Sequence, residues 1–249
     1  MRTFVIGDIH GRYNALLNVL MISGFDMEND RLITLGDICD GGRQTKQCYD
    51  LLLKVKNRID IIGNHDLWFL DWILHGTKEP IWTEQGGHAT MESYGFKREN
   101  VPKEHTDLIK NSLVYVLDNK NRIYVHGGFK PGVPIETQDM LLIVWDRSLI
   151  EYARGYKQAG KWIEGRPIPN YTHVFVGHTT TQIYGATEPI RFNNLTMMDC
   201  GGGWNGRLAM VDVDTHKYYV SNPQKRPKDE EPPETEEMAW GVDPKNPFW

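Results

Sequence analysis

Short apolar runs alternate with amphipathic stretches along the first third of the chain. An apolar run at residues 2–6 precedes a stretch at 13–22, in which Leu16, Leu17 and Leu20 fall on one helical face. The same order repeats twice, with apolar runs at 31–35 and 59–62 and amphipathic stretches at 45–55 and 66–74. This pattern predicts strands and helices in alternation.

The rest of the chain is richer in segments typical of strands. They occupy residues 113–117, 122–125, 173–176, 195–198, 208–213 and 217–220. Alternating elements followed by successive strands indicate an α/β (α+β) protein whose sheet gains antiparallel strands toward the C-terminus.

The composition changes near residue 221. Residues 223–249 contain six of the thirteen prolines and the run KRPKDEEPPETEE, which is typical of a solvated, extended segment. Its last residues, Trp240, Phe248 and Trp249 among them, are apolar enough to dock. We therefore expect one domain at 1–222 and a proline-rich acidic tail at 223–249.

Charge and composition exclude several classes of protein. Of the 249 residues 40% are hydrophobic, enough to bury a sizeable core. A formal net charge of −5 argues against nucleic-acid binding, and no run approaches the roughly 18 apolar residues of a membrane span. A first strand that begins at once leaves no room for a signal peptide, and three cysteines without paired spacing fit a reducing compartment. We expect a cytoplasmic protein.

Five of the predicted strands end in glycine-flanked polar residues. The motifs read GDIHG at 7–11, GDICDGG at 36–42, GNHD at 63–66, HGG at 126–128 and GHT at 177–179. Loops at the carboxyl ends of strands are where open α/β sheets bind ligands. A glycine beside each polar residue lets the chain turn sharply, so the polar side chains are expected to share one pocket.

The side chains of these motifs suit a pair of metal ions. Carboxylate, amide and imidazole donors without a thiolate favour divalent Mn, Fe or Zn. Six or seven donor contacts with one shared carboxylate make two sites, and two metals a few ångströms apart can clamp both oxygens of an in-line displacement at phosphorus. The candidate ligands are Asp8, His10, Asp37, Asn64, His126 and His178.

In their order and spacing the five motifs resemble those of the phosphoprotein-phosphatase family of calcineurin-like metallophosphoesterases. The family pattern is GD-x-HG, GD-x-x-D-x-G, GNH-[DE], HGG and GH, and the likeness extends over residues 1 to about 215. The resemblance implies the calcineurin-like fold, a central β-sandwich flanked by helices, with the domain at 1–222 as the catalytic domain.

The resemblance also implies roles for single residues. Asp8 and His10 would bind the first metal, and Asp37 would bridge to the second, which Asn64, His126 and His178 would complete. A hydroxide bridging the two metals would attack phosphorus. His65 would be the general acid for the leaving oxygen, with Asp40 bonded to its far ring nitrogen. A histidine acting as an acid near neutral pH needs such a partner to stay protonated and oriented.

One position departs from the family pattern. The second motif usually carries an arginine that clamps the substrate phosphate, and here that position is Gly41. Arg43 is the nearest substitute. Arg147, in Trp145-Asp146-Arg147, resembles the W-x-R segment of bacterial and phage members, in which the arginine faces the phosphate. We favour Arg147 over Arg43.

Two further segments carry alternative interpretations. The stretch Gln85-Gly86-Gly87 with Thr90 resembles the bacterial and phage branch and dinucleoside tetraphosphatases. The aromatic residues Trp68, Phe69, Trp72 and Trp82 are explained most simply by helix packing, with a substrate groove as the alternative.

Three functions remain open. The first is hydrolysis of phosphomonoesters in phosphoproteins or small molecules, as in Ser/Thr protein phosphatases. The second keeps the metals but acts on a dinucleoside polyphosphate or a phosphodiester. The third is a weakly active phosphate-binding pseudo-phosphatase, which Gly41 alone supports.

Overall fold

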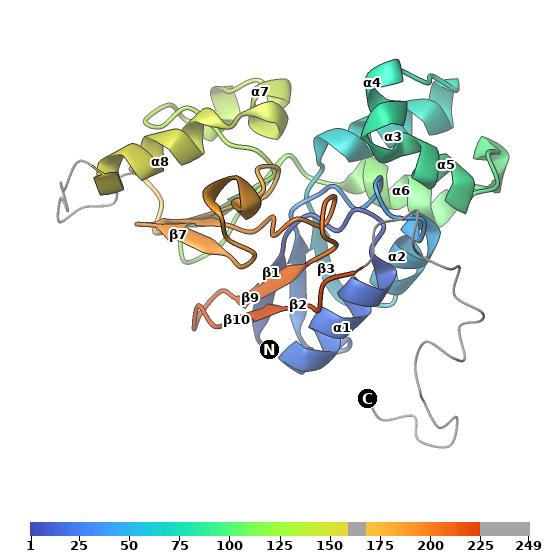
Figure 1. The fold of residues 1–249 in the computed structure, drawn as a ribbon. Coiled ribbons are helices and arrows are strands. Elements are labelled where there is room, and N and C mark those ends of the chain that lie inside the picture. Colours follow the sequence, from blue (N-terminus) through green and yellow to red (C-terminus); the bar gives the residue numbers. More distant parts are fainter. Residues whose placement is uncertain (159–167, 225–249) are drawn as a thin grey trace.

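Two five-stranded sheets, packed face to face, form the centre of the computed structural model, which describes residues 1–158 and 168–224 (Figure 1). The strands are β1 Thr3–Ile6, β2 Arg31–Thr34, β3 Asn57–Asp60, β4 Tyr115–Leu117, β5 Arg122–Val125, β6 His173–Val176, β7 Ile190–Phe192, β8 Leu195–Met197, β9 Ala209–Asp212 and β10 Tyr218–Val220. The helices are α1 Tyr13–Ser23, α2 Thr45–Leu52, α3 Asn64–His75, α4 Pro80–Trp82, α5 His88–Ser93, α6 Lys103–Asn111, α7 Met140–Trp145 and α8 Ser148–Gln158. Single turns η1 Thr83–Gly87, η2 Arg98–Asn100, η3 Ile135–Thr137 and η4 Thr181–Tyr184 join them.

Both sheets mix parallel and antiparallel strands. The first has the order β10-β9-β1-β2-β3, in which β1, β2 and β3 are parallel and β9 runs antiparallel to β1. The second has the order β4-β5-β6-β8-β7, in which β5, β6 and β8 are parallel and β4 and β7 are antiparallel edge strands. Antiparallel strands lie on both sides of the parallel ones in the second sheet and on one side only in the first.

Alternation along the strands divides the buried side chains among three layers. Val5 of β1 points to the space between the sheets, whereas its neighbours Phe4 and Ile6 point to the helices. Tyr124 of β5 and Phe175 of β6 stack between the sheets, with ring centroids 5.1 Å apart. Helices α1, α2 and α3 pack on the first sheet and α8 on the second, while α7 contributes Val144 to the core of the first and Ile143 to the core of the second (Figure 1). The predicted β-sandwich flanked by helices is confirmed.

Several predicted boundaries differ from the observed ones. The strand expected at 59–62 is β3 at Asn57–Asp60, because the chain then leaves the sheet edge and Ile61 bridges to Leu113 instead. The helix expected at 45–55 ends at Leu52, and α3 begins at Asn64 rather than at residue 66. The tail expected at 223–249 lies outside the described residues from 225 onward.

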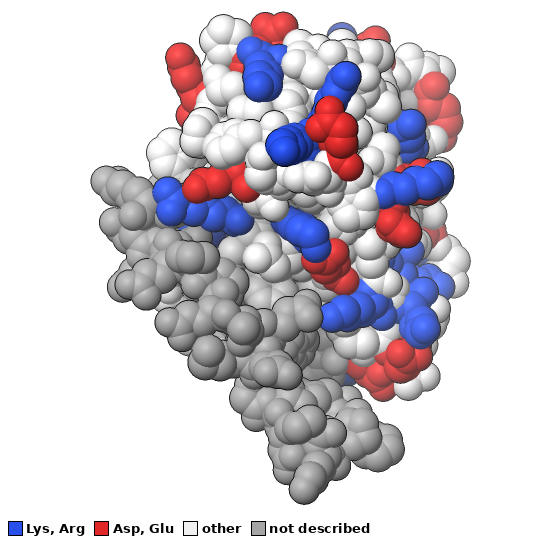
Figure 2. Space-filling model, turned by 90° about the vertical axis from the view of Figure 1, so that its right-hand side faces the viewer, with Lys and Arg blue, Asp and Glu red and all other residues white. Residues whose placement is uncertain are grey.

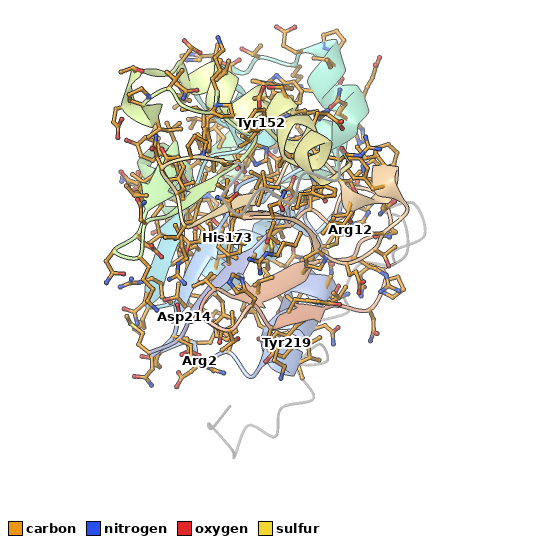
Figure 3. All side chains as sticks on the ribbon, turned by 90° about the vertical axis from the view of Figure 1, so that its left-hand side faces the viewer. Arg2, Arg12, Tyr152, His173, Asp214 and Tyr219 are labelled. Carbon is orange, nitrogen blue, oxygen red and sulfur yellow. The ribbon has the colours of Figure 1, made fainter. Side chains whose placement is uncertain are left out.

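The surface that faces the viewer in Figure 2 carries charges of both signs. On the face at the right of Figure 1, Lys and Arg side chains lie among Asp and Glu side chains rather than in one basic patch (Figure 2). Other charged or titratable side chains lie inside, among them Arg12 at 1% exposed and His173 at 3% (Figure 3). Within 1–158 and 168–224, each helix is too short or too polar to cross a bilayer.

Candidate active site

The five sequence motifs meet where the parallel strands of both sheets end. Asp8 follows β1, Asp37 follows β2 and Asn64 opens α3, while His126 follows β5 and His178 follows β6. Hydrogen bonds from His178 and His126 tie the sheets together at this edge. The His178 amide donates to both carboxylate oxygens of Asp8 at 3.1 and 3.0 Å, and His126 Nδ1 donates to the carbonyl oxygen of Leu35 at 2.7 Å.

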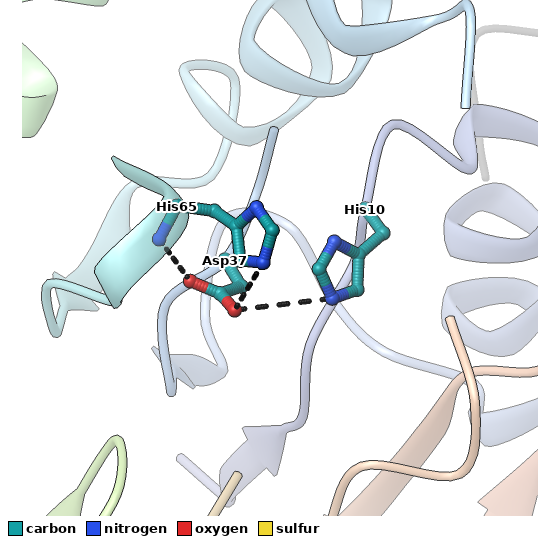
Figure 4. A group of neighbouring side chains, drawn as sticks. All are labelled: His10, Asp37 and His65. Carbon is teal, nitrogen blue, oxygen red and sulfur yellow. Dashed lines mark hydrogen bonds and ion pairs between the residues drawn. The ribbon is translucent and has the colours of Figure 1, made fainter. Parts of the chain in front are cut away.

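Asp37 lies at the centre of the site (Figure 4). Its Oδ2 is 3.8 Å from His10 Nε2, 4.0 Å from His65 Nε2 and 3.4 Å from His126 Nε2. Its Oδ1 accepts a hydrogen bond from the His65 amide at 2.9 Å. Burial opposes ionisation of this carboxyl, but His126 and His65 hold the pKa of Asp37 well below its usual range. One carboxylate therefore faces imidazoles from several loops.

The imidazoles are oriented to ligate through Nε2. His10 Nδ1 donates to the Cys39 carbonyl at 3.1 Å, as His126 Nδ1 does to Leu35, so in each ring the second nitrogen faces the centre. His126 Nε2 lies 3.0 Å from Asn64 Oδ1. His178 Nε2 is buried with no hydrogen-bond partner, an arrangement that a buried polar atom rarely adopts unless something else occupies its lone pair.

These donors fit divalent cations. The ligand atoms of Asp37, His126 and His178 lie within 4.8 Å of one another, as do those of His10, Asp37 and His65. Asp8 Oδ2 is 3.9 Å from His10 Nε2. The set is made of oxygen and imidazole nitrogen, and Asp37 belongs to both groups, which is what two neighbouring cations with one shared carboxylate require.

The pKa values of these histidines differ. Burial and the charge on His65 lower the pKa of His10 to about 4. Burial and His126 lower the pKa of His178 to about 3, and Arg147 adds to that effect. Both rings are therefore neutral near pH 7, the form that ligates metal. At His126 burial lowers the pKa, but the opposing effects, of which that of Asp37 is the largest, raise the pKa to about 10. This ring would have to lose a proton to become a ligand.

The backbone of the site is strained. His10, Asp37, Asp40 and His178 have φ values of 51°, 50°, 69° and 59°, in the left-handed region that side chains other than glycine seldom adopt. A Cβ on Gly63 would lie 2.1 Å from Asp37 Oδ1, so this motif glycine is required by the close approach of the two loops. Such strain is concentrated at functional sites because the surrounding fold must hold it in place.

A hydrogen-bonded pair lies beside the central carboxylate. His65 Nδ1 donates to Asp40 Oδ2 at 2.7 Å. Burial lowers the pKa of His65, but Asp37 and Asp40 together raise it to about 9. The ring is therefore protonated at neutral pH, with Nε2 directed toward Asp37. This arrangement is that of a proton donor kept charged and oriented by a carboxylate.

The family assignment follows from comparison with known proteins. The profile of the calcineurin-like phosphoesterases matches residues 1–198 of the chain. The chain belongs to the calcineurin-like phosphoesterase family. It is therefore a phosphoric ester hydrolase of a family that uses divalent metals, as the motifs predicted.

Relatives of this phosphoesterase include bacterial phosphatases. Serine/threonine-protein phosphatase 1 of Salmonella typhimurium is 24% identical over 84% of this chain and 91% of its own length, and serine/threonine-protein phosphatase 2 of the same organism is 27% identical over 84% and 92%. A symmetrical bis(5'-nucleosyl)-tetraphosphatase of Coxiella burnetii is 34% identical over 27% of this chain and 23% of its own. Among solved structures, a Saccharomyces cerevisiae serine/threonine phosphatase covers 91% of this chain and 81% of its own at 13% identity, with a TM-score of 0.58.

Two residues to which the sequence assigned no role in the site, Trp82 and Thr90, hold the carboxylate partner of His65. Asp40 accepts hydrogen bonds from Trp82 Nε1 at 2.8 Å and from the Thr90 hydroxyl at 2.7 Å, in addition to the one from His65. Burial raises the pKa of Asp40, and these three donors oppose that rise. Gly86 lies between Trp82 and Thr90 in the chain, and a Cβ there would lie 2.2 Å from the Gly41 nitrogen. The segment from α4 to α5 thus packs on the second motif and fixes Asp40.

Two further buried carboxyls support the loops. Asp66 accepts hydrogen bonds from the amides of Asp37 at 2.7 Å, Ile38 at 3.1 Å and Gly63 at 3.0 Å, which joins the second and third motifs. Asp199 accepts from the Gly201 amide at 2.8 Å, and after burial its charge is the next largest cause of the raised pKa of Asp8. Asp199 follows β8, and its sequence MDCG has the same strand-then-glycine pattern as the other motifs.

The two candidate phosphate-binding arginines lie in different surroundings. Arg147 is exposed just after α7, and its charge contributes to the low pKa of His178. Arg43 instead pairs with Glu92 of α5, with 3.3 Å between Nε and Oε2. A Cβ added to Gly41 would make ordinary van der Waals contact, with His10 Cβ nearest at 3.5 Å, although the φ of 89° at this position favours glycine. The structure thus brings Arg147, rather than Arg43, near the ligand set.

We expect Arg147→Ala to lower kcat/KM for a phosphopeptide by about 10- to 100-fold, because it removes a charge-assisted donor to phosphate oxygens. Arg43→Ala is the matched control, and its kcat/KM should change less than about threefold, since that guanidinium is engaged by Glu92 at a half-exposed position. Initial rates with purified variants measure both. The opposite ranking of the two variants would assign the phosphate to Arg43.

Proposed function

We propose that this phosphoesterase is a protein-serine/threonine phosphatase that hydrolyses phosphomonoesters. The observation that carries the proposal is the adjacency of two features: the Asp37-centred donor set and the His65–Asp40 pair beside it. Two relatives named serine/threonine-protein phosphatases align over nine-tenths of their own length, which supports the same substrate class.

In this proposal Asp8, His10 and Asp37 would hold one divalent cation, and Asp37, Asn64, His126 and His178 the other. We propose Mn²⁺, with Fe and Zn as the alternatives that the same donors accept. Bound cations would supply positive charge to the phosphate oxygens and lower the pKa of water.

The protein's own residues perform the remaining tasks. His65 delivers its proton to the leaving oxygen, which would otherwise depart as an unstable alkoxide. Asp40, fixed by Trp82 and Thr90, holds the ring in the orientation that this transfer needs. Arg147 binds phosphate oxygens and takes the place of the arginine absent at position 41. Asp66 holds two of the motif loops in register through their amides.

Two alternatives compete with this proposal. A dinucleoside polyphosphatase is supported by the likeness to the Coxiella burnetii enzyme, but that likeness extends over 68 residues only. A weakly active phosphate-binding protein would explain Gly41, yet the donor set and the acid pair are all present in the chain.

Three free, buried thiols support our proposal that the enzyme works in the cytoplasm, on phosphoprotein or small phosphoester substrates.

Comparison of substrates tests the proposal. With Mn²⁺ present, we expect kcat/KM for a phosphoseryl or phosphothreonyl peptide to exceed that for diadenosine tetraphosphate by at least about tenfold, because the relatives that align over nine-tenths of their length are named serine/threonine-protein phosphatases. Phosphate release is measured for both substrates at equal enzyme concentration. A preference for the dinucleotide would establish the second function, and turnover of neither by metal-loaded enzyme would establish the third.

A further inference from the structure

Four aromatic rings form a continuous row beside the site. Trp68 contacts His65 edge to face, with centroids 5.0 Å apart, and Trp145 contacts Trp68 in the same manner at 5.2 Å. Trp145 also contacts His178 at 5.8 Å. Trp68 belongs to α3, which packs on the first sheet, and Trp145 ends α7, whose Ile143 packs in the core of the second. The row therefore runs from the proton donor to a predicted metal ligand across both halves of the sandwich.

Packing inside the protein leaves part of both tryptophan side chains exposed. Trp145 is 40% exposed, although its helix neighbours Ile143 and Val144 are buried. Trp68 is partly buried, whereas Phe69 and Trp72 of the same helix are buried completely or nearly so. Edge-to-face contacts leave part of each indole face uncovered. Exposed indole surface next to an active site is available for a planar group of the substrate.

The need to protonate the leaving oxygen determines which part of the substrate lies next to Trp68. The leaving oxygen must come within hydrogen-bond reach of His65 Nε2 to receive its proton. The group attached to that oxygen then lies within one ring's width of Trp68, because Trp68 touches the His65 ring. An aromatic leaving group at this place can stack on Trp68 and Trp145, whereas a seryl methylene is too short to do so.

We propose that Trp68 and Trp145 form the surface that contacts the leaving group, so that these two residues determine the selectivity of the enzyme between aryl and alkyl phosphomonoesters. The inference rests on the proposed phosphomonoesterase function. In the reaction the oxygen of water bonds to phosphorus, the P–O(aryl) bond breaks, and the phenol oxygen takes the proton of His65, which a proton from the attacking water replaces. The products are inorganic phosphate and the free phenol.

The test uses two peptides that differ only in carrying phosphotyrosine or phosphoserine at one position. The quantity measured is the ratio of their kcat/KM values in Mn²⁺-loaded full-length enzyme, because a general loss of activity cancels in it. We expect Trp145→Leu to lower the phosphotyrosine-to-phosphoserine ratio about tenfold, and Trp145→Phe, which keeps an aromatic face, to stay within about threefold of the native ratio.

Trp204 supplies the matched control. It is 67% exposed and follows Gly203, which packs on the His10 ring, but it makes no ring contact with Trp68 or Trp145 among the described residues. Trp204→Leu should leave the ratio within about twofold of the native value. Equal losses for both peptides in Trp145→Leu would overturn the inference and leave Trp145 a packing residue. Hydrolysis of neither peptide by the native enzyme would overturn the proposed function, and the inference with it.

Discussion

Replacement of His65 by asparagine is expected to lower kcat for a phosphoseryl peptide by about 10²- to 10⁴-fold, the usual contribution of a general acid. The alkoxide of serine is a poor leaving group, so its departure depends on the proton that His65 holds with the help of Asp40 at 2.7 Å. p-Nitrophenyl phosphate releases a stable anion and should lose less activity in the same variant. Steady-state kinetics with the two substrates measure this difference.

His75→Asn is the control for that variant. His75 is the last residue of the same helix α3, and its side chain is 68% exposed, so its loss should leave both rates unchanged within about twofold. Equal losses with the peptide and with p-nitrophenyl phosphate in His65→Asn would contradict a role in leaving-group protonation. That result would assign His65 to metal binding. The distance of 4.0 Å between His65 Nε2 and Asp37 Oδ2 is compatible with a cation between the two atoms.

Removal of divalent cations is expected to abolish hydrolysis, and addition of Mn²⁺ to restore it in the native chain but not in Asp37→Asn. Asp37 belongs to both groups of ligand atoms, so its loss should reduce activity on the order of 10³-fold or more and lower the amount of bound metal. Asparagine keeps the shape of the side chain and removes its charge. Elemental analysis after dialysis, together with assays in EDTA and in Mn²⁺, gives both readouts.

Asp71→Asn controls for the loss of one negative charge. Asp71 lies on α3 with its side chain 45% exposed, and this variant should bind as much metal as the native chain. Full activity of the native chain in EDTA after exhaustive dialysis would exclude a role for metal in the reaction. Full metal content in Asp37→Asn would show instead that Asp37 is not the shared ligand.

The parallel strands and their terminal motifs were predictable because both signals are local. Strands β1, β2 and β6 are buried on both faces and so read as apolar runs, and each is followed within two residues by a glycine and then a polar residue. Strand β3, of sequence NRID, is only half-buried, and its position was predicted two residues too late. The antiparallel edge strand β7 was missed. It has three residues, IRF, one of them exposed, which is too short a run for alternation to be recognised.

The residues that orient the proton donor were not predictable in the same manner. Trp82 and Thr90 donate to Asp40 from 42 and 50 residues away in sequence. Nothing in the local pattern around Trp82 distinguishes an indole that packs from one that also donates a hydrogen bond. The role of Arg43 could not be settled from sequence for the same reason, because its partner Glu92 lies on another helix.

The ligand set is divided between the two halves of the sandwich. Asp8, His10, Asp37 and Asn64 precede residue 65, whereas His126 and His178 belong to the second sheet and are synthesised later. A nascent chain that holds only β1, β2 and β3 therefore has an incomplete set and no Arg147. The first sheet itself is completed by β9 and β10, which follow β6 in the chain, so the full donor set and the full fold arise at the same stage of synthesis.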